Sequence, residues 1–387
     1  MEFGYRIKNE WLLDDGVTFL NHGSFGATPL KVLQAKEEFE RRLEREPFTF
    51  FIEEYNVLLI ESLSKLAKFV GSKEENIVLV ENATTGVNTV LRSLEKELKP
   101  GDEIITPNHV YHGVWNTMKF IANRTGAKAV EFDIPFPVVN NELIIEKIIN
   151  QITPKTKIII LDHIASPTAL IFPVKEIIEL CRSKGIITII DGAHAPGMLE
   201  LNIESLGADF YTGNCHKWMF TPKGCALLWI SKEWQSKINP LVISLFHGNS
   251  FQEEFAWTGT KNPAPWLSLS PAIDFYNALD FTKVREYNHK LVCDATELIC
   301  SELKINEHAN YDMLGFMSSI ELPVKMKIDE KTTMELRNHF MKKYWIELPF
   351  HIFDNRIFFR ISAQVYNEID DYKKLVSALK DFITKNK

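Results

Sequence analysis

Several features that mark other classes of protein are absent from this chain of 387 residues. It has no excess of positive charge, because 44 Lys and Arg stand against 51 Asp and Glu and give a formal net charge of -7. The basic residues are not gathered, so we do not expect a nucleic-acid partner. No apolar run approaches the ~18 residues of a membrane span. The opening MEFGYRIKNEW has no apolar stretch of signal-peptide length, so we expect a cytoplasmic protein without a membrane partner.

Cysteine is sparse and shows no pairing pattern. The five cysteines are odd in number and include no Cys-x-x-Cys spacing. They therefore predict reduced, intracellular thiols, with neither a disulfide framework nor a metal site. A Gly-x-Gly-x-x-Gly run after a strand is also missing, which disfavours a nicotinamide-dinucleotide enzyme. The cysteines are Cys181, Cys215, Cys225, Cys293 and Cys300.

What the chain does contain is typical of a folded soluble protein. Hydrophobic residues make up 45% and charged residues 25% of the sequence, which is ordinary for a globular domain. The length suits two domains, or one large domain with an appendage.

Short apolar segments alternate with helical segments between about residues 76 and 231. The alternation predicts a largely parallel sheet that is covered on both faces. Too few residues separate the last two strands for a helix, so we expect one edge to be antiparallel. The predicted strands are 76–80, 103–106, 128–132, 157–161, 186–191, 209–212 and 225–230, and the helices between them are 85–98, 113–125, 142–152 and 174–183.

Helical patterns flank this region on both sides. Amphipathic helices are predicted at 30–45 and 54–70, with Pro29 and Gly71 as start and stop signals. The C-terminal part reads as a second, α+β domain, joined near Asn262-Pro263-Ala264-Pro265. We predict an N-terminal segment at 1–18, a large domain at 19–265 and a small domain at 266–387. The C-terminal elements are helices at 270–303, 332–343 and 370–384 and strands at 313–321 and 356–362.

Asp191 and Lys217 are the two residues whose surroundings point most directly to chemistry. Asp191 ends an apolar strand, and open α/β sheets bind ligands at the carboxyl ends of their strands. A helix cap or turn is the other common use of such an aspartate. Lys217 precedes Trp218-Met219-Phe220, so its amine is expected to be partly desolvated, with a lowered pKa. Taken alone, it could equally be a surface lysine.

Together these two residues supply what pyridoxal 5'-phosphate (PLP) chemistry requires. The Lys217 amine can form a Schiff base with the cofactor aldehyde. The Asp191 carboxylate can hold the proton on the pyridine nitrogen, so that the ring accepts electrons from the substrate.

Five motifs spread over residues 19 to 363 carry a resemblance to a known family. The chain resembles the fold-type I PLP enzymes of the class V aminotransferase family, which includes the cysteine desulfurases, and most of all its isopenicillin N epimerase-like branch. The resemblance implies the PLP-transferase fold type I, with a mostly parallel mixed sheet between helices and a smaller α+β domain. The motifs are Leu20-Asn21-His22-Gly23-Ser24-Phe25-Gly26, Asn82-Ala83-Thr84-Thr85-Gly86, Asp191-Gly192-Ala193-His194, Asn214-Cys215-His216-Lys217-Trp218 and Arg360-Ile361-Ser362-Ala363.

The resemblance implies a phosphate site built from two segments. Ala83, Thr84 and Thr85 follow a strand and open a helix, where free N–H groups and the helix dipole bind phosphate. An ordinary threonine cap would look the same. Asn214 holds the small polar position three residues before the lysine and is expected to donate to the phosphate. His216 is expected to make a second phosphate or scaffold contact, unless it is a structural histidine.

The resemblance also assigns residues around the cofactor ring. Tyr111 is expected to stack on the pyridine face, with His109 as the alternative, and packing in the core or at the rim is open for either. His194 is expected to reach the phenolic oxygen, and Ser166 could do the same.

The substrate and the partner subunit are assigned in the same way. Arg360 lies on an apolar strand and needs a partner; the family uses the matching arginine as a bidentate clamp on the substrate carboxylate. Asn21 and His22 are expected to line the substrate pocket. Thr260, in Trp257-Thr258-Gly259-Thr260, resembles the segment that reaches the phosphate of the other subunit, so a homodimer with composite active sites is implied. A turn with a buried tryptophan is the simpler alternative.

One departure limits the expected function. Cysteine desulfurases carry a nucleophilic cysteine late in the chain, but no cysteine follows Cys300 here. Cys293 and Cys300 read as buried, inert thiols on a helix, so persulfide formation is not expected.

We expect a PLP enzyme that acts at the α-carbon of an amino acid, with Lys217 as general base. Isopenicillin N epimerase-like racemisation is the first expectation, and a β-eliminating C–S lyase or an aminotransferase is the alternative. A non-catalytic PLP-fold ligand-binding protein is the alternative from another class. The joint presence of Lys217, Asp191 and Arg360 counts against it.

Overall fold

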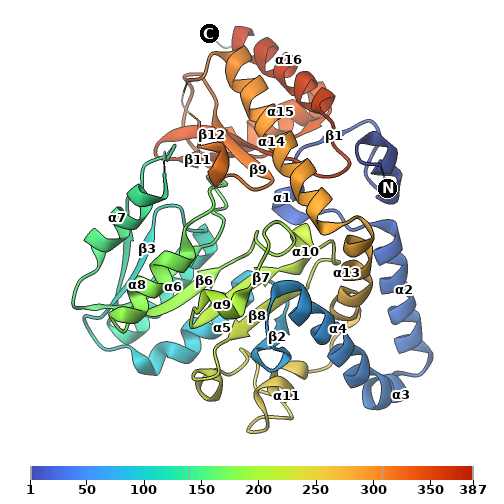
Figure 1. Cartoon of the computed structure of the whole chain (residues 1–387), viewed down its shortest axis with the longest axis vertical. Helices are drawn as coiled ribbons and strands as arrows, with labels where there is room; N and C mark the ends of the chain where they lie inside the picture. The colour runs from blue at the N-terminus through green and yellow to red at the C-terminus, as the bar shows by residue number, and fades with distance from the viewer. Residues whose placement is uncertain (1, 139, 307, 386–387) are drawn as a thin grey trace.

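The computed structural model describes residues 2–138, 140–306 and 308–385. In these residues, seven strands form a central sheet in the order β2-β8-β7-β6-β5-β3-β4 (Figure 1). Neighbouring strands are parallel except for the two pairs that β8 makes. The predicted mostly parallel mixed sheet is therefore confirmed. Its strands are β2 (Ile77–Val80), β3 (Glu103–Pro107), β4 (Lys128–Phe132), β5 (Thr156–Asp162), β6 (Ile187–Asp191), β7 (Phe210–Asn214) and β8 (Ala226–Ile230).

The expected antiparallel pairing at one edge of the sheet is confirmed, although β8, the strand that runs in the opposite direction, lies one place inside the edge. β8 pairs with β7 on one side and with β2 on the other. Only α10 (Cys215–Trp218) and a turn separate β7 from β8, and a parallel neighbour would need a much longer crossover. β2, from early in the chain, then covers the free edge of β8.

Each face of the sheet has its own apolar layer because side chains alternate along a strand. In β5, Ile158 and Ile160 pack with α5 and α6, whereas Ile159 and Leu161 pack with α4, α7 and α8. The residues at the strand ends lie outside both apolar layers, so polar side chains can occupy these positions. The covering helices are α5 (Ala83–Ser93) and α6 (His112–Thr125) on one face and α4 (Tyr55–Val70), α7 (Asn141–Gln151) and α8 (Val174–Ser183) on the other.

The N-terminal helices end where their punctuating residues predict. α2 (Leu30–Arg45) begins directly after Pro29, and α4 ends at Gly71, whose φ of 62° suits glycine. The short helix α1 (His22–Phe25) packs against α10. The contact is close, because a Cβ on Gly26 would lie 2.3 Å from the carbonyl oxygen of His216. The first segment of the chain therefore supports the turn that carries Lys217.

A second, three-stranded antiparallel sheet lies above the first in Figure 1, in the order β11-β12-β9. Its apolar side chains form a separate cluster with α14, α15 and α16. The short strand β1 (Thr18–Phe19) pairs with β10 (Ile346–Glu347), which ties the N-terminal segment to this part. The elements are β9 (Met317–Glu321), β11 (Phe350–Phe353), β12 (Arg356–Ser362), α14 (Phe281–Leu303), α15 (Glu330–Tyr344) and α16 (Ile369–Lys385).

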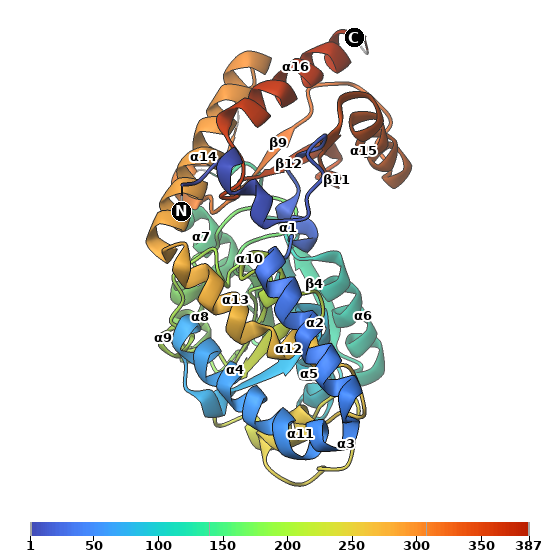
Figure 2. The ribbon, with the colours of Figure 1, turned by 90° about the vertical axis from the view of Figure 1, so that its right-hand side faces the viewer.

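The helix that we predicted at 270–303 is two helices. α13 (Leu269–Ala278) and α14 are separated at Asp280, which has a φ of 68° and whose carboxylate accepts the Lys283 N–H. Asp is a favoured N-cap, and this local bond competes with continuation of the helix. α13 packs against α2 and α4 (Figure 2), whereas α14 packs against α16 and β9. The domain division at residues 265 and 266 remains our proposal.

No helix in the described part of the chain is long and apolar enough to cross a membrane.

The remaining helical elements are short. These elements are η1 (Tyr5–Glu10), α3 (Pro47–Thr49), the π-helix η2 (Phe50–Glu54), η3 (Glu74–Asn76), η4 (Leu94–Glu97), α9 (Ile203–Leu206), η5 (Gln235–Lys237), α11 (Phe251–Ala256), α12 (Ala264–Leu267) and η6 (Tyr311–Met313).

Candidate active site

A cavity of about 350 Å³ lies at the carboxyl ends of β5, β6 and β7 and reaches Arg360 of the second sheet. It collects ten of the fourteen side chains that the sequence predicts for the site. The four that do not line it are Asn21, His22, Thr85 and Thr260. The ten that do are Ala83, Thr84, Tyr111, Ser166, Asp191, His194, Asn214, His216, Lys217 and Arg360.

Lys217 is held by a histidine whose tautomer follows from its partners. The Trp218 indole N–H donates to His194 Nδ1 at 3.4 Å, and His194 Nε2 lies 2.9 Å from Lys217 Nζ. Burial lowers the pKa of His194 well below its usual range, so the ring is neutral. With Nδ1 accepting, the proton sits on Nε2 and is donated to the lysine amine.

The lysine amine can accept that hydrogen bond because its lowered pKa leaves part of it neutral, with a free lone pair. Burial, and then the nearby charge of Arg360, lower the pKa of Lys217 to about 7, whereas the charges of Asp191 and Asp162 oppose the shift. A substantial fraction of the amine is therefore neutral near pH 7, which is what imine formation and proton abstraction require.

Asp191 occupies the last position of β6 and is buried. Its Oδ1 accepts the Ala193 N–H at 2.9 Å. Burial raises the pKa of this carboxyl, against the influence of the Ala193 N–H and of Lys217. A buried carboxylate of this kind gains most from a cationic N–H donor on a bound molecule.

The start of α5 presents a site for an anion. Asn82 caps the helix, with Oδ1 accepting the Thr85 N–H at 2.9 Å and the Thr85 hydroxyl at 3.2 Å. Asn214 Oδ1 accepts the Ala83 N–H at 2.8 Å, and the Gly86 N–H bonds to the Asn82 carbonyl. Of these first N–H groups, the one of Thr84 is left for a ligand, together with the amide nitrogen of Asn214.

Arg360 is a buried cation that has no carboxylate partner in the described part of the chain. Its terminal nitrogens donate to the carbonyl and hydroxyl of Ser166 and, at 3.2 Å, to the hydroxyl of Ser24. Its Nε–H finds no acceptor among the described residues. Burial lowers the pKa of Arg360 to about 10, so the group stays charged at neutral pH. Three neutral oxygens hold the guanidinium in place while leaving its charge available to a carboxylate.

Asn21 and His22 lie behind the cavity wall and support it. His22 Nε2–H donates to the Lys217 carbonyl at 3.0 Å, and Nδ1 accepts the Tyr366 hydroxyl at 2.7 Å. Burial lowers the pKa of His22 to about 3, so it is neutral. Asn21 bonds to Ser24 and Glu347. The following residues, Ser24 and Phe25, line the cavity in their place.

Thr85, His109 and Thr260 are also placed outside the cavity. Both donors of Thr85 are used by the Asn82 cap. His109 is buried between the Thr168 hydroxyl, at 2.7 Å, and the Ile134 carbonyl, at 3.0 Å, so the structure disfavours it as the ring-stacking residue. Tyr111, which is 47% exposed, does line the cavity. Thr260 is exposed, as a residue that serves another subunit would be in a single chain.

Asp162 is the residue that our sequence reasoning missed. It is the last residue of β5, lines the cavity, and lies beside Asp191 in the parallel register of β5 and β6. The signal was available, because Asp162 ends an apolar strand in the same way as Asp191.

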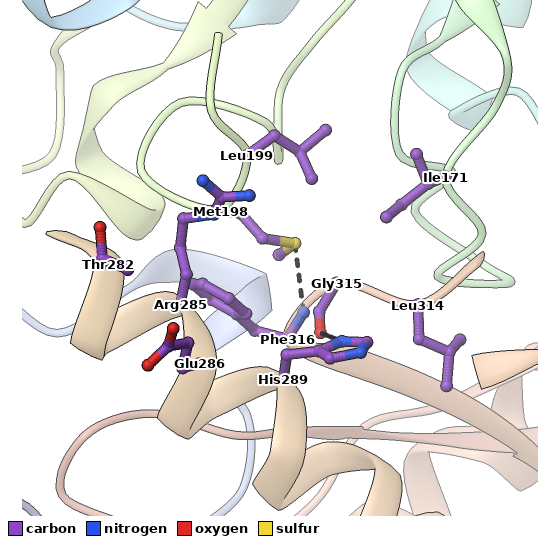
Figure 3. A pocket seen from close by; sticks show the side chains of 10 residues that line it. All are labelled: Ile171, Met198, Leu199, Thr282, Arg285, Glu286, His289, Leu314, Gly315 and Phe316. Atoms are coloured by element: carbon purple, nitrogen blue, oxygen red, sulfur yellow. Dashed lines mark hydrogen bonds between the residues drawn. The ribbon is translucent and has the colours of Figure 1, made fainter. Parts of the chain in front are cut away.

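A second cavity of about 350 Å³ lies between α14, the Met198-Leu199 turn and the start of β9 (Figure 3). No lysine lines it, and its arginine, Arg285, is paired with Glu200 at 2.9 Å. None of the buried side-chain atoms that lack a partner among the described residues belongs to its walls. Two of them, Asp162 Oδ1 and Arg360 Nε, belong to residues that line the first cavity.

Comparison with known proteins agrees with this site. The family model described as "Aminotransferase class-V" matches residues 27–314, so the chain belongs to the class V aminotransferase family. It is an enzyme of that family, and its cofactor is pyridoxal 5'-phosphate. The lysine, the buried carboxylate and the anion site at the start of α5 fit this group, which carries an aldehyde, a ring nitrogen and a phosphate.

The relatives differ in the reactions they are named for. A probable L-cysteine desulfhydrase of Arabidopsis thaliana is 26% identical, with 94% of this chain and 82% of that protein covered. An isopenicillin N epimerase of Amycolatopsis lactamdurans is 27% identical, with coverage of 95% and 96%. A hercynylcysteine sulfoxide lyase of Schizosaccharomyces pombe is 26% identical, with coverage of 98% of each.

The fold is that of fold-type I enzymes. A solved cysteine desulfurase of Thermococcus onnurineus NA1 superposes with a TM-score of 0.82 at 19% identity, covering 100% of this chain and 99% of that one. At that identity the likeness speaks for the fold alone.

The low pKa of Lys217 can be tested in the protein freed of its cofactor. Arg360→Gln removes a positive charge that opposes protonation, so the pKa of Lys217 should rise from about 7 by about 1 unit or more. The measurement is the pH dependence of amine labelling at Lys217, read by peptide mass spectrometry. Arg124→Gln, on the exposed face of α6, is the matched control and should leave the midpoint unchanged. An unshifted midpoint in Arg360→Gln would contradict the assigned cause.

Proposed function

We propose that this enzyme uses Lys217 to remove the α-proton of an amino-acid substrate and then releases a sulfur substituent from the β-carbon, as a C–S lyase. The observation that carries the proposal is the buried Lys217 amine, hydrogen-bonded to His194 and facing both a carboxylate and an unpaired arginine. The remaining residues of the cavity are assigned around it.

We assign the cofactor contacts as follows. Lys217 would hold the cofactor through its aldehyde, and Asp191 would hold the proton of the ring nitrogen. Bound PLP supplies an aldehyde for the substrate amine and a ring that accepts the electrons of the broken C–H bond. Tyr111 packs on the ring, and His194 and Ser166 are available to its phenolic oxygen. The N–H of Thr84 and the side chains of Thr84, Asn214 and His216 bind the phosphate, at the junction formed by Ala83 and Thr85.

The substrate carboxylate is proposed to bind Arg360. The hydroxyls of Ser24 and Ser166 hold the guanidinium, and its Nε–H, which has no partner among the described residues, is available to the carboxylate. This fixes the α-carbon relative to Lys217, which then acts as general base. The His194 bond to Nζ keeps the amine directed. Asn21 and His22 act indirectly, by positioning Ser24 and the Lys217 backbone.

Two observations favour elimination over the other outcomes. Two of the relatives described above, at 26% identity, are named as a probable L-cysteine desulfhydrase and a hercynylcysteine sulfoxide lyase. In addition, Tyr111, Ser166 and Arg360 border an adjoining cavity of about 420 Å³, which gives room for a leaving group. None of the five cysteines, all of which lie in the described residues, lines the Lys217 cavity, so no persulfide on the protein is proposed. Epimerisation is the second candidate, because the 27% identical epimerase is covered over 96% of its length.

The reaction can be identified from the products. S-substituted L-cysteines and their sulfoxides should each yield pyruvate, ammonia and the sulfur fragment in equal amounts, and Lys217→Ala should yield none of them at a comparable rate. L-Alanine, which has no leaving group, is the matched control and should give no pyruvate without a keto-acid acceptor. Formation of the D-enantiomer without pyruvate would reject the lyase and support the epimerase. Keto acid formed only when an acceptor is supplied would indicate an aminotransferase.

We also propose a homodimer with composite active sites. Leu241, Val242, Ile243 and Leu245 are exposed on one loop, and clustered exposed apolar side chains mark association surfaces. Thr260 follows on the same stretch of chain and lies outside its own cavity. Its hydroxyl is then available to the phosphate bound by the other subunit.

Mixed dimers can test this arrangement. Thr260→Ala subunits combined with Lys217→Ala subunits should yield heterodimers with one doubly damaged site and one intact site. At low PLP concentration the mixture should therefore be more active than the average of its parents. Mixing Lys217→Ala with Asp191→Asn is the control, because both residues belong to the same chain's site and no intact site can form. Equal behaviour of the two mixtures, or full activity in a monomer, would contradict the proposal.

A further inference from the structure

The carboxyl of Asp162 has no role in the site as described so far, although it occupies the same position at the end of its strand as Asp191 does. The two residues are paired in register at the ends of neighbouring parallel strands, which lie about 4.8 Å apart in a sheet. The His163 N–H donates to the Asp191 carbonyl at 2.8 Å, so the ladder is intact up to this point. Both carboxyls therefore emerge on the same side of the sheet, and both line the cavity.

The carboxyl of Asp162 is buried, and one of its oxygens lacks a partner among the described residues. The backbone N–H groups of Ser166 and Tyr111 favour its charged form and so partly oppose the rise in its pKa. The side chain is only 4% exposed, and its Oδ1 has no partner among the described residues. By contrast, Asp191 Oδ1 accepts the Ala193 N–H. A buried polar atom without a partner is costly, and here its residue lines a cavity that takes a ligand.

Few positive charges are available to neutralise the carboxyls of Asp162 and Asp191. Lys217 acts on both carboxyls. Arg360, the other cation at the cavity, is held by the oxygens of Ser166 and Ser24, and its Nε has no partner among the described residues. His194 is neutral. Burial, and then the charge of Asp191, raise the pKa of Asp162 well above its usual range, as expected when two acids share a site with little positive charge.

We infer that Asp162 is a second cofactor-binding carboxyl of this site, which carries a proton and donates it in a hydrogen bond to the bound cofactor while Asp191 carries the negative charge. The inference rests on the proposed role of Asp191 at the cofactor ring. A carboxylic acid next to a carboxylate can act as a donor where the carboxylate acts as an acceptor. The pair then places one negative charge, and not two, at the floor of the cavity.

The protonation state is tested on the purified holoenzyme by infrared spectroscopy at pH 7. The C=O band of a protonated carboxylic acid should be present in the wild type and absent from Asp162→Asn, which keeps the shape and a donor but cannot be an acid. Asp209→Asn is the control, since Asp209 bonds to Thr188 and Trp234 at the opposite end of the strands, and it should keep the band. Persistence of the band in Asp162→Asn, or its absence from the wild type, would overturn the inference.

The contact with the cofactor is tested by the dissociation constant of PLP, measured by equilibrium dialysis. Asp162→Asn should bind within about threefold of the wild type, whereas Asp162→Leu, which has neither donor nor acceptor, should bind about tenfold more weakly or worse. Near-UV circular dichroism checks that the leucine variant is folded; should it be unfolded, the infrared result decides. Unchanged binding by folded Asp162→Leu would overturn the contact and leave the proposed function standing. PLP attached to a lysine other than Lys217 in the wild type would overturn the proposed function and this inference together.

Discussion

Two cations and two acids share one buried cavity, and the geometry of the site depends on how these four charges are balanced. Lys217, Arg360, Asp162 and Asp191 all line it. Buried charges are stable only with partners, yet the arginine is held by neutral oxygens and the lysine by a neutral histidine. The lysine therefore has a lowered pKa, and the arginine has no anionic partner among the described residues. The carboxylate of the proposed amino-acid substrate would complement the arginine.

The fold brings these charges together from distant parts of the chain. Parallel strands place the ends of β5, β6 and β7 at one edge, so that Asp162, Asp191 and the Lys217 turn become neighbours. Arg360 comes from the second sheet and bonds to Ser166, 194 residues earlier. The N-terminal segment closes the arrangement through the bond between His22 and the Lys217 carbonyl and through the contact of Gly26 with the same turn.

The sequence predicted those parts of the molecule that regular patterns specify. The strands and helices of the large sheet follow from alternating and helical periodicity. Asp191 and Lys217 could be found because Asp191 ends the strand β6 and Lys217 lies in the short turn α10 that follows β7. The sequence did not show which strand would lie at the edge of the sheet, because β2 and β8 are joined only in three dimensions. It also missed β11, whose hairpin turn at Asp354 and Asn355 takes positive φ values, as these two residue types tolerate.

The errors in the predicted site residues have a similar cause. A motif identifies a segment of the chain but does not show which of its side chains point into the cavity. We therefore predicted Asn21 and His22 at the cavity, whereas Ser24 and Phe25 line it. Thr85 was predicted as a ligand contact, but the Asn82 cap uses its donors. Asp162 ends an apolar strand as Asp191 does, but its place beside Asp191 depends on the register between β5 and β6, which one sequence does not reveal.

The central claim is that Lys217 moves the α-proton of the substrate. It is tested most directly by incubating the enzyme in D₂O with an L-amino acid that lacks a leaving group and following deuterium at the α-carbon by NMR. The account predicts exchange by the wild type, and exchange slower by about 10²–10⁴-fold in Lys217→Ala that still contains PLP. Exchange at the wild-type rate in that variant would contradict the account, because the base would then be another group.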